Sequence, residues 1–184
     1  MERVNRILED ADFIRYIAKN KELEMGMERV NRILKDADFI GYIAKNKELE
    51  KERVFCRHDL NHLLDVCRIS WILNLEEGLS INKEKIYAAG LLHDIGRWIE
   101  YETGQDHTIA SGELAEGILD RCGFSDDEKT EIVEAIKSHR KKEHSTDLSR
   151  ILYRADKLSR PCFSCEAIGQ CKRFKQAEKP FLLY

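Results

Sequence analysis

The chain has 184 residues, and its 31 Lys and Arg against 34 Asp and Glu give a formal net charge of −3. The length suits one domain with a sizeable core plus an extension, and a hydrophobic content of 42% excludes a disordered chain. The charge argues against an extended phosphate-binding face, so nucleic acid is not an expected partner, although local basic groups could hold a small phosphorylated ligand.

Neither a membrane span nor a secretory signal is visible. No apolar run approaches the roughly 20 residues that cross a bilayer, and the first residues, MERVNRILEDADF, lack a basic segment followed by an apolar one. We therefore expect a soluble cytoplasmic protein without a membrane partner. Its six cysteines would then be thiols or metal ligands rather than disulfides.

The chain begins with a repeat. Residues 1–24 recur as residues 27–50, with differences only at Glu9/Lys35 and Arg15/Gly41. Solenoids usually need three or more diverged units, so two near-identical copies indicate a recent duplication or an added segment. Apolar residues recur at helical spacing in both copies, and an Asp-Ala-Asp sequence could cap a second helix in each. The unit contains no His or Cys, so it predicts packing helices without chemistry of their own.

The second copy is contiguous with the rest of the chain and should fill the groove that evolved for this segment. The first copy has nearly the same apolar face and must find another surface. We expect residues 1–26 to mediate self-association, for instance in a homodimer that exchanges the copies, or to be poorly ordered. In either case we expect them not to touch the site of chemistry.

From residue 52 onward the pattern is helical, without alternating strands or hairpin signals. A capping residue, Asn82, and a capping box, Ser125 to Glu128, mark two helix starts. The sequence predicts an all-α protein, a compact helical bundle with three parts: residues 1–26, a core over residues 27–160 and a Cys-containing tail over residues 161–184. The expected helices cover about residues 53–77, 82–98, 107–122, 125–142 and 147–160.

Histidine and aspartate occur at the ends of these helices. His58 and His62 share one helix face, and the pair His93-Asp94 ends a strongly apolar helix (IYAAGLLHDIG). Such polar groups need partners, because burying them unpaired is costly. His107, His139 and Asp156 follow on later helices, and a bundle can bring side chains from facing helices to one centre. Imidazole and carboxylate together suit Fe, Mn, Zn or Ni.

The order of these motifs resembles the HD superfamily of metal-dependent phosphohydrolases. The matching segments are NHLLDVCRI, LLHDIGR, DHTIASGELAEGIL, AIKSHR and ILYRADKLSR, and the resemblance covers about residues 54–160. It implies a helical HD-type fold in which His62, His93, Asp94 and Asp156 hold one metal ion. Two further histidines mark the dinuclear branch, and His107 and His139 fill those positions, so Asp94 would bridge two ions.

This branch includes bacterial symmetrical dinucleoside-tetraphosphate hydrolases, which the chain resembles most. HD-GYP phosphodiesterases are a poorer match, because the chain has His139-Arg140 instead of a His pair and lacks a Gly-Tyr-Pro sequence. Two metal ions can clamp a phosphate and activate water at neutral pH. The resemblance therefore implies water attack on phosphorus in a nucleotide or another small phosphorylated substrate. The candidate catalytic residues are Asp94, as the bridging ligand, and three basic neighbours of the ligands, which are candidates for phosphate contact: Arg97, Arg140 and Lys157.

The tail carries three cysteines in the sequence RPCFSCEAIGQCKRF. Cys162, Cys165 and Cys171 suit a thiolate site that lacks one ligand, and Cys56 is the best candidate for the fourth. A structural Zn ion or an Fe–S cluster would fit such a set. The alternative is a group of reduced, partly buried thiols.

Two functions remain open from the sequence. The first is a phosphohydrolase, which the complete ligand set favours. The alternative is a non-catalytic HD domain that binds a nucleotide or metal as a sensor, with the cysteines reporting redox or metal status. Loops and pocket shape choose the substrate, so no motif identifies it.

Overall fold

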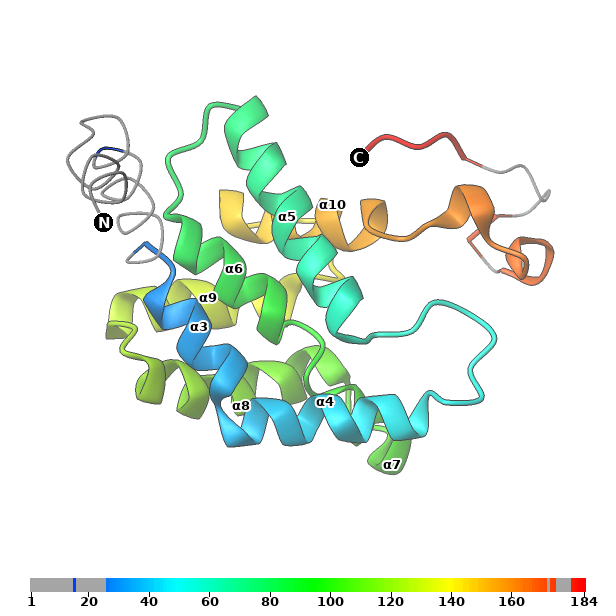
Figure 1. Cartoon of the computed structure of the whole chain (residues 1–184), viewed down its shortest axis with the longest axis horizontal. Coiled ribbons are helices and arrows are strands. Elements are labelled where there is room, and N and C mark those ends of the chain that lie inside the picture. Colours follow the sequence, from blue (N-terminus) through cyan, green and yellow to red (C-terminus); the bar gives the residue numbers. More distant parts are fainter. Residues whose placement is uncertain (1–14, 16–25, 172, 175–179) are drawn as a thin grey trace, which may run out of the picture.

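The computed structural model describes residue 15 and residues 26–171, 173–174 and 180–184. The expectations for residues 1–26 therefore fall almost entirely outside the described part. Within it the protein is all-α, as predicted, and contains no strand (Figure 1). The helices are α3 (Glu28–Lys35), α4 (Ala37–Leu49), α5 (Leu60–Glu76), α6 (Lys83–Leu92), α7 (Arg97–Thr103), α8 (His107–Cys122), α9 (Asp126–Ser138) and α10 (Asp147–Leu158), followed by the short 3-10 turns η1 (Cys162–Ser164) and η2 (Ile168–Gln170).

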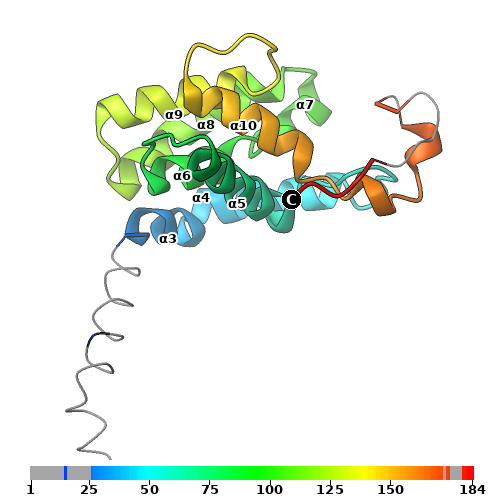
Figure 2. The ribbon, with the colours of Figure 1, turned by 90° about the horizontal axis from the view of Figure 1, so that it is seen from above.

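The second copy of the repeat forms α3 and α4, which lie against the bundle (Figures 1 and 2). Asp36 separates them, because its extended backbone breaks the helix and its side chain accepts hydrogen bonds from the backbone N–H groups of Asp38 and Phe39. Val30, Ile33 and Phe39 are buried in the common core. Helix α3 packs on α6 and α8, and α4 packs on α7.

The long helix predicted from residue 53 begins only at Leu60. Asp59 is its N-cap and accepts a hydrogen bond from the backbone N–H of His62. The preceding loop is held in another shape, because the Glu50 carboxylate binds the backbone N–H of His58 and Arg53 binds the carbonyl of Cys56. Because of these contacts, the residues before Asp59 are not helical, whereas His62 still lies in the first turn of α5.

The helix predicted over residues 82–98 starts correctly and ends early. Asn82 caps α6 through the N–H groups of Glu84 and Lys85. The helix stops at Leu92, and a turn carries the His93-Asp94 pair before α7 begins. The buried Asn46 amide stabilises this break, since it donates to the Asp94 carbonyl at 2.9 Å and accepts from Trp98 N–H at 2.8 Å.

The later helices agree more closely with the predicted ranges. Helix α8 spans His107–Cys122 and ends at Gly123, whose φ of 86° suits glycine. Ser125 and Glu128 form the capping box of α9, which ends at Ser138 rather than near Lys142. The early end places His139 at the C-cap, where its ring nitrogen Nδ1 lies within hydrogen-bond distance, 2.7 Å, of the Ile136 carbonyl oxygen.

One hydrophobic core joins these helices. Helix α5 packs on α6 and α10, α9 packs on α8 and α10, and fully buried side chains such as Leu63, Leu92, Ile136 and Ile151 lie between them. Figure 2 shows α3 and α4 on one side of this bundle, and the segment after α10 at the end where the loop before α5 also lies. None of the described helices is both long enough and apolar enough to cross a membrane.

Close packing at Gly96 provides a test of this arrangement. A Cβ atom there would lie 2.6 Å from the backbone nitrogen of Ser111, inside α8. We expect Gly96→Ala to lower the free energy of unfolding by about 1–3 kcal/mol, because the turn after Asp94 must move away from α8. The measurement is urea unfolding followed by circular dichroism.

The matched control is Gly41→Ala on α4, where an added Cβ meets nothing within 4 Å. This change should stabilise the helix by roughly 0.5–1 kcal/mol. Equal unfolding free energies for the two variants would show that the turn is not packed as described.

Candidate metal centre

Six buried side chains, from five helices and the turns that end two of them, meet inside the bundle. His62 comes from the first turn of α5, His93 and Asp94 from the turn after α6, His107 from the start of α8, His139 from the C-cap of α9 and Asp156 from α10. Each is at most 9% exposed. The structure therefore brings together all six residues predicted as metal ligands.

Asp94 lies between two groups of donors. One group contains His62, His93, Asp94 and Asp156, and the other contains Asp94, His107 and His139; within each group the ligand atoms lie within 4.8 Å of one another. Asp94 Oδ2 is 3.2 Å from His93 Nε2, while Oδ1 is 3.1 Å from His107 Nε2. Each carboxylate oxygen thus faces a different group, as a carboxylate that bridges two ions would.

The histidines of the centre are held by their outer nitrogens. His93 and His139 each pair Nδ1 with the carbonyl three residues earlier, at 2.8 and 2.7 Å. His107 pairs Nδ1 with Glu100 at 2.7 Å, and His62 Nδ1 lies 3.3 Å from the hydroxyl of Ser159. An Nδ1–H bonded to an acceptor leaves the Nε2 lone pair directed at the centre, which is how metal-binding imidazoles are oriented.

The centre has polar atoms without partners and an uneven charge. Nε2 of His62, Nε2 of His93 and Oδ1 of Asp94 are buried and make no hydrogen bond. Burial lowers the pKa of His139 to about 3, so this ring is neutral at pH 7. Burial opposes the charge on His93 too, but Asp94 and Asp156 raise the pKa of His93. The two buried carboxylates thus favour a positive charge at this point, which bound cations would supply, and the donor set fits divalent metal ions.

A buried pair beside the centre was not among the predicted site residues. His58 Nε2 lies 3.8 Å from Asp94 Oδ2, and His58 Nδ1 is 2.6 Å from Glu50 Oε1. Glu50 also accepts a hydrogen bond from Tyr101 at 2.6 Å. The four-residue spacing of His58 and His62 could have indicated His58 as a site residue. Glu50 had no such signal, because it lies in the repeat, where the sequence indicated no chemistry.

The predicted phosphate contacts lie at different depths. Arg97 is partly buried, with Nη1 at 2.9 Å from His107 Nδ1, and it also pairs with Glu100 at 3.1 Å. Lys157 pairs with Asp156, whereas Arg140 is 55% exposed and 3.7 Å from Glu100. Arg160 was missed, although it follows Asp156 by one helical turn and binds its carboxylate at 2.8 Å.

Three of the four cysteines of the predicted thiolate site lie around one cavity. Cys56, Cys162 and Cys165 line one cavity of about 380 Å³ between the loop before α5 and the segment after α10, but Cys171 does not line it. Among the described residues no thiol belongs to a group of three ligand atoms within 4.8 Å. Cys162 begins η1, while Cys165 and Cys171 directly follow η1 and η2. Metal binding by these cysteines stays a prediction. Cys67 and Cys122 are buried core residues, as expected.

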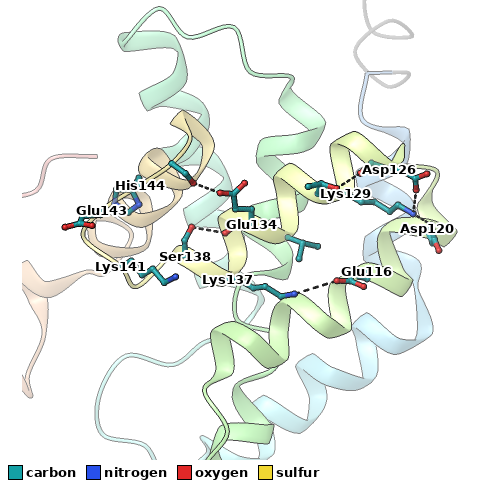
Figure 3. Close-up of a pocket in the computed structure, with 13 residues that line it drawn as sticks. Glu116, Asp120, Asp126, Lys129, Glu134, Lys137, Ser138, Lys141, Glu143 and His144 are labelled. Atoms are coloured by element: carbon teal, nitrogen blue, oxygen red, sulfur yellow. Dashed lines mark hydrogen bonds and ion pairs between the residues drawn. The ribbon is translucent and has the colours of Figure 1, made fainter.

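Two cavities differ in their relation to the centre. The cavity with the cysteines also exposes His62, Asn61 and Arg160, so it reaches the centre from the α5 side. A larger cavity of about 1060 Å³ runs along α8, α9 and the following loop (Figure 3). Its lining consists mostly of charged side chains, several of which pair with one another, such as Lys137 with Glu116 at 3.7 Å. None of the six predicted metal ligands lines it.

The Glu50 contacts predict a pH dependence of stability. Burial opposes ionisation of Glu50, but its bonds to His58 and Tyr101 lower the pKa of its carboxyl from 4.5 to about 2. The resulting stability is complete above pH 4.5 and is lost as the pH falls towards 2. With a chelator present, we compare the free energies of unfolding at pH 5 and pH 2. The decrease should be about 2 kcal/mol larger for the wild-type protein than for Glu50→Gln. Parallel pH profiles from urea unfolding would contradict this account of Glu50.

Comparisons with known proteins point to one family. The family model for the HD domain matches residues 59–160. An uncharacterised protein of Clostridium beijerinckii is 44% identical over 184 residues, which are 100% of this chain and 99% of the relative. Ribonuclease Y of Mycoplasma mycoides is 34% identical over 101 residues, which are 54% of this chain but only 22% of the ribonuclease.

A solved structure agrees with the family model. The crystal structure of a predicted HD superfamily hydrolase from an uncultured Thermotogales bacterium is similar, with a TM-score of 0.53 and 30% sequence identity. The match covers 71% of this chain and 67% of the other.

Proposed function

The chain belongs to the HD-domain family of metal-dependent phosphohydrolases, and we propose that it hydrolyses a small phosphorylated compound, with a nucleotide as the favoured class. The observation that carries the proposal is the placement of Asp94, whose two oxygens face two separate sets of buried donors. This arrangement supports the dinuclear branch over a mononuclear one, and supports an enzyme over a sensor, since a pure binding module has no need of both sets.

The residues divide into those that would hold ions and those that would hold substrate. His62, His93 and Asp156 would bind one divalent ion with Asp94, and His107 and His139 would bind a second with it. Bound ions would supply a water of lowered pKa and polarise the phosphoryl oxygens. Fe, Mn, Zn and Ni all suit this donor set.

Basic side chains around the centre would bind the substrate. Arg97 lies beside His107 and Arg160 beside Asp156, so each arginine adjoins a different donor group. Their guanidinium groups can each pair two phosphate oxygens, which orients the phosphorus towards the centre. Lys157 can contribute charge on the Asp156 side, and the exposed Arg140 can reach a more distant phosphate of a nucleotide.

A second candidate substrate comes from the ribonuclease Y relatives, which match more than half of this chain. A phosphodiester in a short RNA is compatible with the same centre. The net charge of −3 and the small cavity beside His62 favour a small substrate instead.

The test is a substrate panel on the full chain loaded with Mn²⁺ or Fe²⁺. The panel contains nucleoside mono-, di- and triphosphates, a dinucleoside tetraphosphate, an RNA oligomer and a simple aryl phosphate. Release of inorganic phosphate or a nucleotide that stops with chelator and returns with metal supports the proposal. Binding of a nucleotide without turnover on any substrate would favour the sensor.

A further inference from the structure

His58 is a buried histidine beside the metal centre to which the proposed function gives no role. It lies in the loop before α5 and is only 3% exposed. Its ring continues the row of histidine rings in the centre, because its centroid is 5.4 Å from that of His62. The remaining neighbours in this row, which runs from His62 through His93 and His139 to His107, are 5.0 to 5.5 Å apart. The row therefore has His58 at one end and His107 at the other.

A glutamate holds each end of this row. Glu50 Oε1 is 2.6 Å from His58 Nδ1, and Glu50 Oε2 accepts a hydrogen bond from the backbone N–H of His58 at 2.6 Å. Glu100 lies in the same way 2.7 Å from His107 Nδ1. An ionised carboxylate can only accept, so His58 Nδ1 donates to Glu50, and Nε2 of the neutral ring keeps its lone pair. Glu50 therefore makes His58 Nε2 a hydrogen-bond acceptor.

This nitrogen faces the donor group that contains His62 but lies outside it. His58 Nε2 is 3.8 Å from Asp94 Oδ2, as is His62 Nε2. Among the ligand atoms that lie within 4.8 Å of one another, His62 is included and His58 is not, so His58 is not placed to share the ion of this group. Two acceptors that face each other at 3.8 Å leave room for one donor at hydrogen-bond distance from both, and a water molecule has two O–H groups to give.

We propose that His58 Nε2 accepts a hydrogen bond from the water that attacks phosphorus, and that Glu50 holds His58 in the tautomer that this contact needs. The inference rests on the proposed hydrolysis. His58 is then a catalytic residue and Glu50 a positioning residue. The contact turns one O–H bond of the water towards His58, so that a lone pair of the water oxygen faces the phosphorus. Orientation of this kind matters because a misplacement of about 1 Å can cost roughly 100-fold in rate.

The proposal gives the second copy of the repeat a part in the chemistry. Glu50 is the C-cap of α4 and the last residue of that copy. One helical turn earlier, the buried Asn46 binds the Asp94 carbonyl and the Trp98 N–H, so α4 holds both the turn that carries Asp94 and the histidine that faces it. The interpretation of the repeat as packing helices without chemistry of their own therefore does not describe this copy.

The variant Glu50→Gln tests the role of the tautomer. The amide oxygen must accept the backbone N–H of His58, so the amide NH₂ takes the place of Oε1 and donates to His58 Nδ1. The ring proton then moves to Nε2, which becomes a donor and can no longer accept from the water. We expect kcat to fall by about 100-fold with KM unchanged, because the altered contact is made to water and not to substrate.

The variant His58→Phe keeps a ring in this place and removes both nitrogens, and it should lose kcat to the same extent. Within the described part of the chain, His58 hydrogen-bonds only Glu50 and holds none of the six ligands. Both variants should therefore keep the Mn²⁺ affinity of the wild-type protein by calorimetry, whereas loss of a group that holds a ligand costs about 10- to 100-fold. Glu50→Gln preserves the side-chain volume, so it carries the test alone if His58→Phe does not fold.

Tyr101→Phe is the matched control. The Tyr101 hydroxyl donates to the same Glu50 oxygen at 2.6 Å, but this side chain is 40% exposed. Its loss leaves Glu50 as an acceptor for His58 Nδ1 and leaves the tautomer unchanged. We expect kcat, KM and Mn²⁺ affinity close to those of the wild-type protein.

A crystal structure of the full chain with Mn²⁺ supplies a readout that needs no turnover. We expect an ordered water about 2.6–3.2 Å from His58 Nε2 in the wild-type protein, and no water in that place in His58→Phe. Absence of turnover by the wild-type protein on every substrate of the panel is a different result, since it refutes the proposed hydrolysis whether or not this water is present.

Three results would overturn the role of His58 in an active enzyme. In the first, Glu50→Gln and His58→Phe keep the wild-type kcat, or no water lies beside Nε2. In the second, KM rises while kcat is unchanged, which would show that Nε2 binds the substrate and not the attacking water. In the third, His58→Phe loses 10-fold or more in Mn²⁺ affinity, which would make His58 a ligand.

Discussion

Replacing Asp94 with Asn is expected to release all metal from the centre and to abolish hydrolysis. The change removes the negative charge that faces both donor groups, and Asp94 is the only residue common to them. Changes outside the ligand shell already cost 10- to 100-fold in metal affinity. We therefore expect the affinity for both ions to fall by more than about 100-fold. The measurement is the metal that stays bound after dialysis, determined by mass spectrometry.

The fold should survive this substitution, since the contact from Asn46 reaches the Asp94 backbone and not its side chain. The matched control is Asp65→Asn, a half-exposed carboxylate of α5 outside the two donor groups, which should leave metal content unchanged. Wild-type metal content in the Asp94 variant would remove this residue from the centre.

The second large effect is expected from His139→Ala, which removes one ligand of the group formed by Asp94, His107 and His139 and leaves the other group complete. Metal content should fall from two ions per chain to one. Hydrolysis should fall by roughly 10²–10³-fold, because one ion supplies several kcal/mol of charge stabilisation in the transition state.

His144 provides the control for this variant, since it follows His139 by five residues but belongs to neither donor group. Its ring packs on Tyr153, with 4.9 Å between the ring centroids. His144→Ala should keep both ions and full activity. If His139→Ala also keeps two ions, the assignment of His139 as a ligand is wrong.

Much of the centre could be predicted from the sequence, because its chemistry lies in a few residue types in a fixed order. His62, the His93-Asp94 pair and Asp156 are each embedded in an apolar helical pattern where unpaired polar groups are costly. The helix caps at Asn82 and Ser125 could also be predicted, because hydrogen bonds between residues close in sequence determine them.

Features that depend on contacts between distant segments could not be predicted. The break after Leu92 rests on Asn46, which lies 48 residues before the carbonyl it binds. Glu50 and Glu100 likewise gain their roles from the packing of α4 and α7 beside the centre. The cysteine site stays a prediction, because Cys56, Cys162 and Cys165 line one cavity but Cys171 does not, and the spacing of the tail cysteines alone does not determine that placement.

Asp94 is proposed to bridge two metal ions, and anomalous X-ray diffraction from crystals of the full chain grown with Mn²⁺ would locate the ions. We expect two anomalous peaks about 3.5–4 Å apart, one beside His62, His93 and Asp156 and the other beside His107 and His139, with one oxygen of Asp94 directed at each. A single peak would reduce the centre to one ion, and peaks that lie away from Asp94 would exclude it as the bridge.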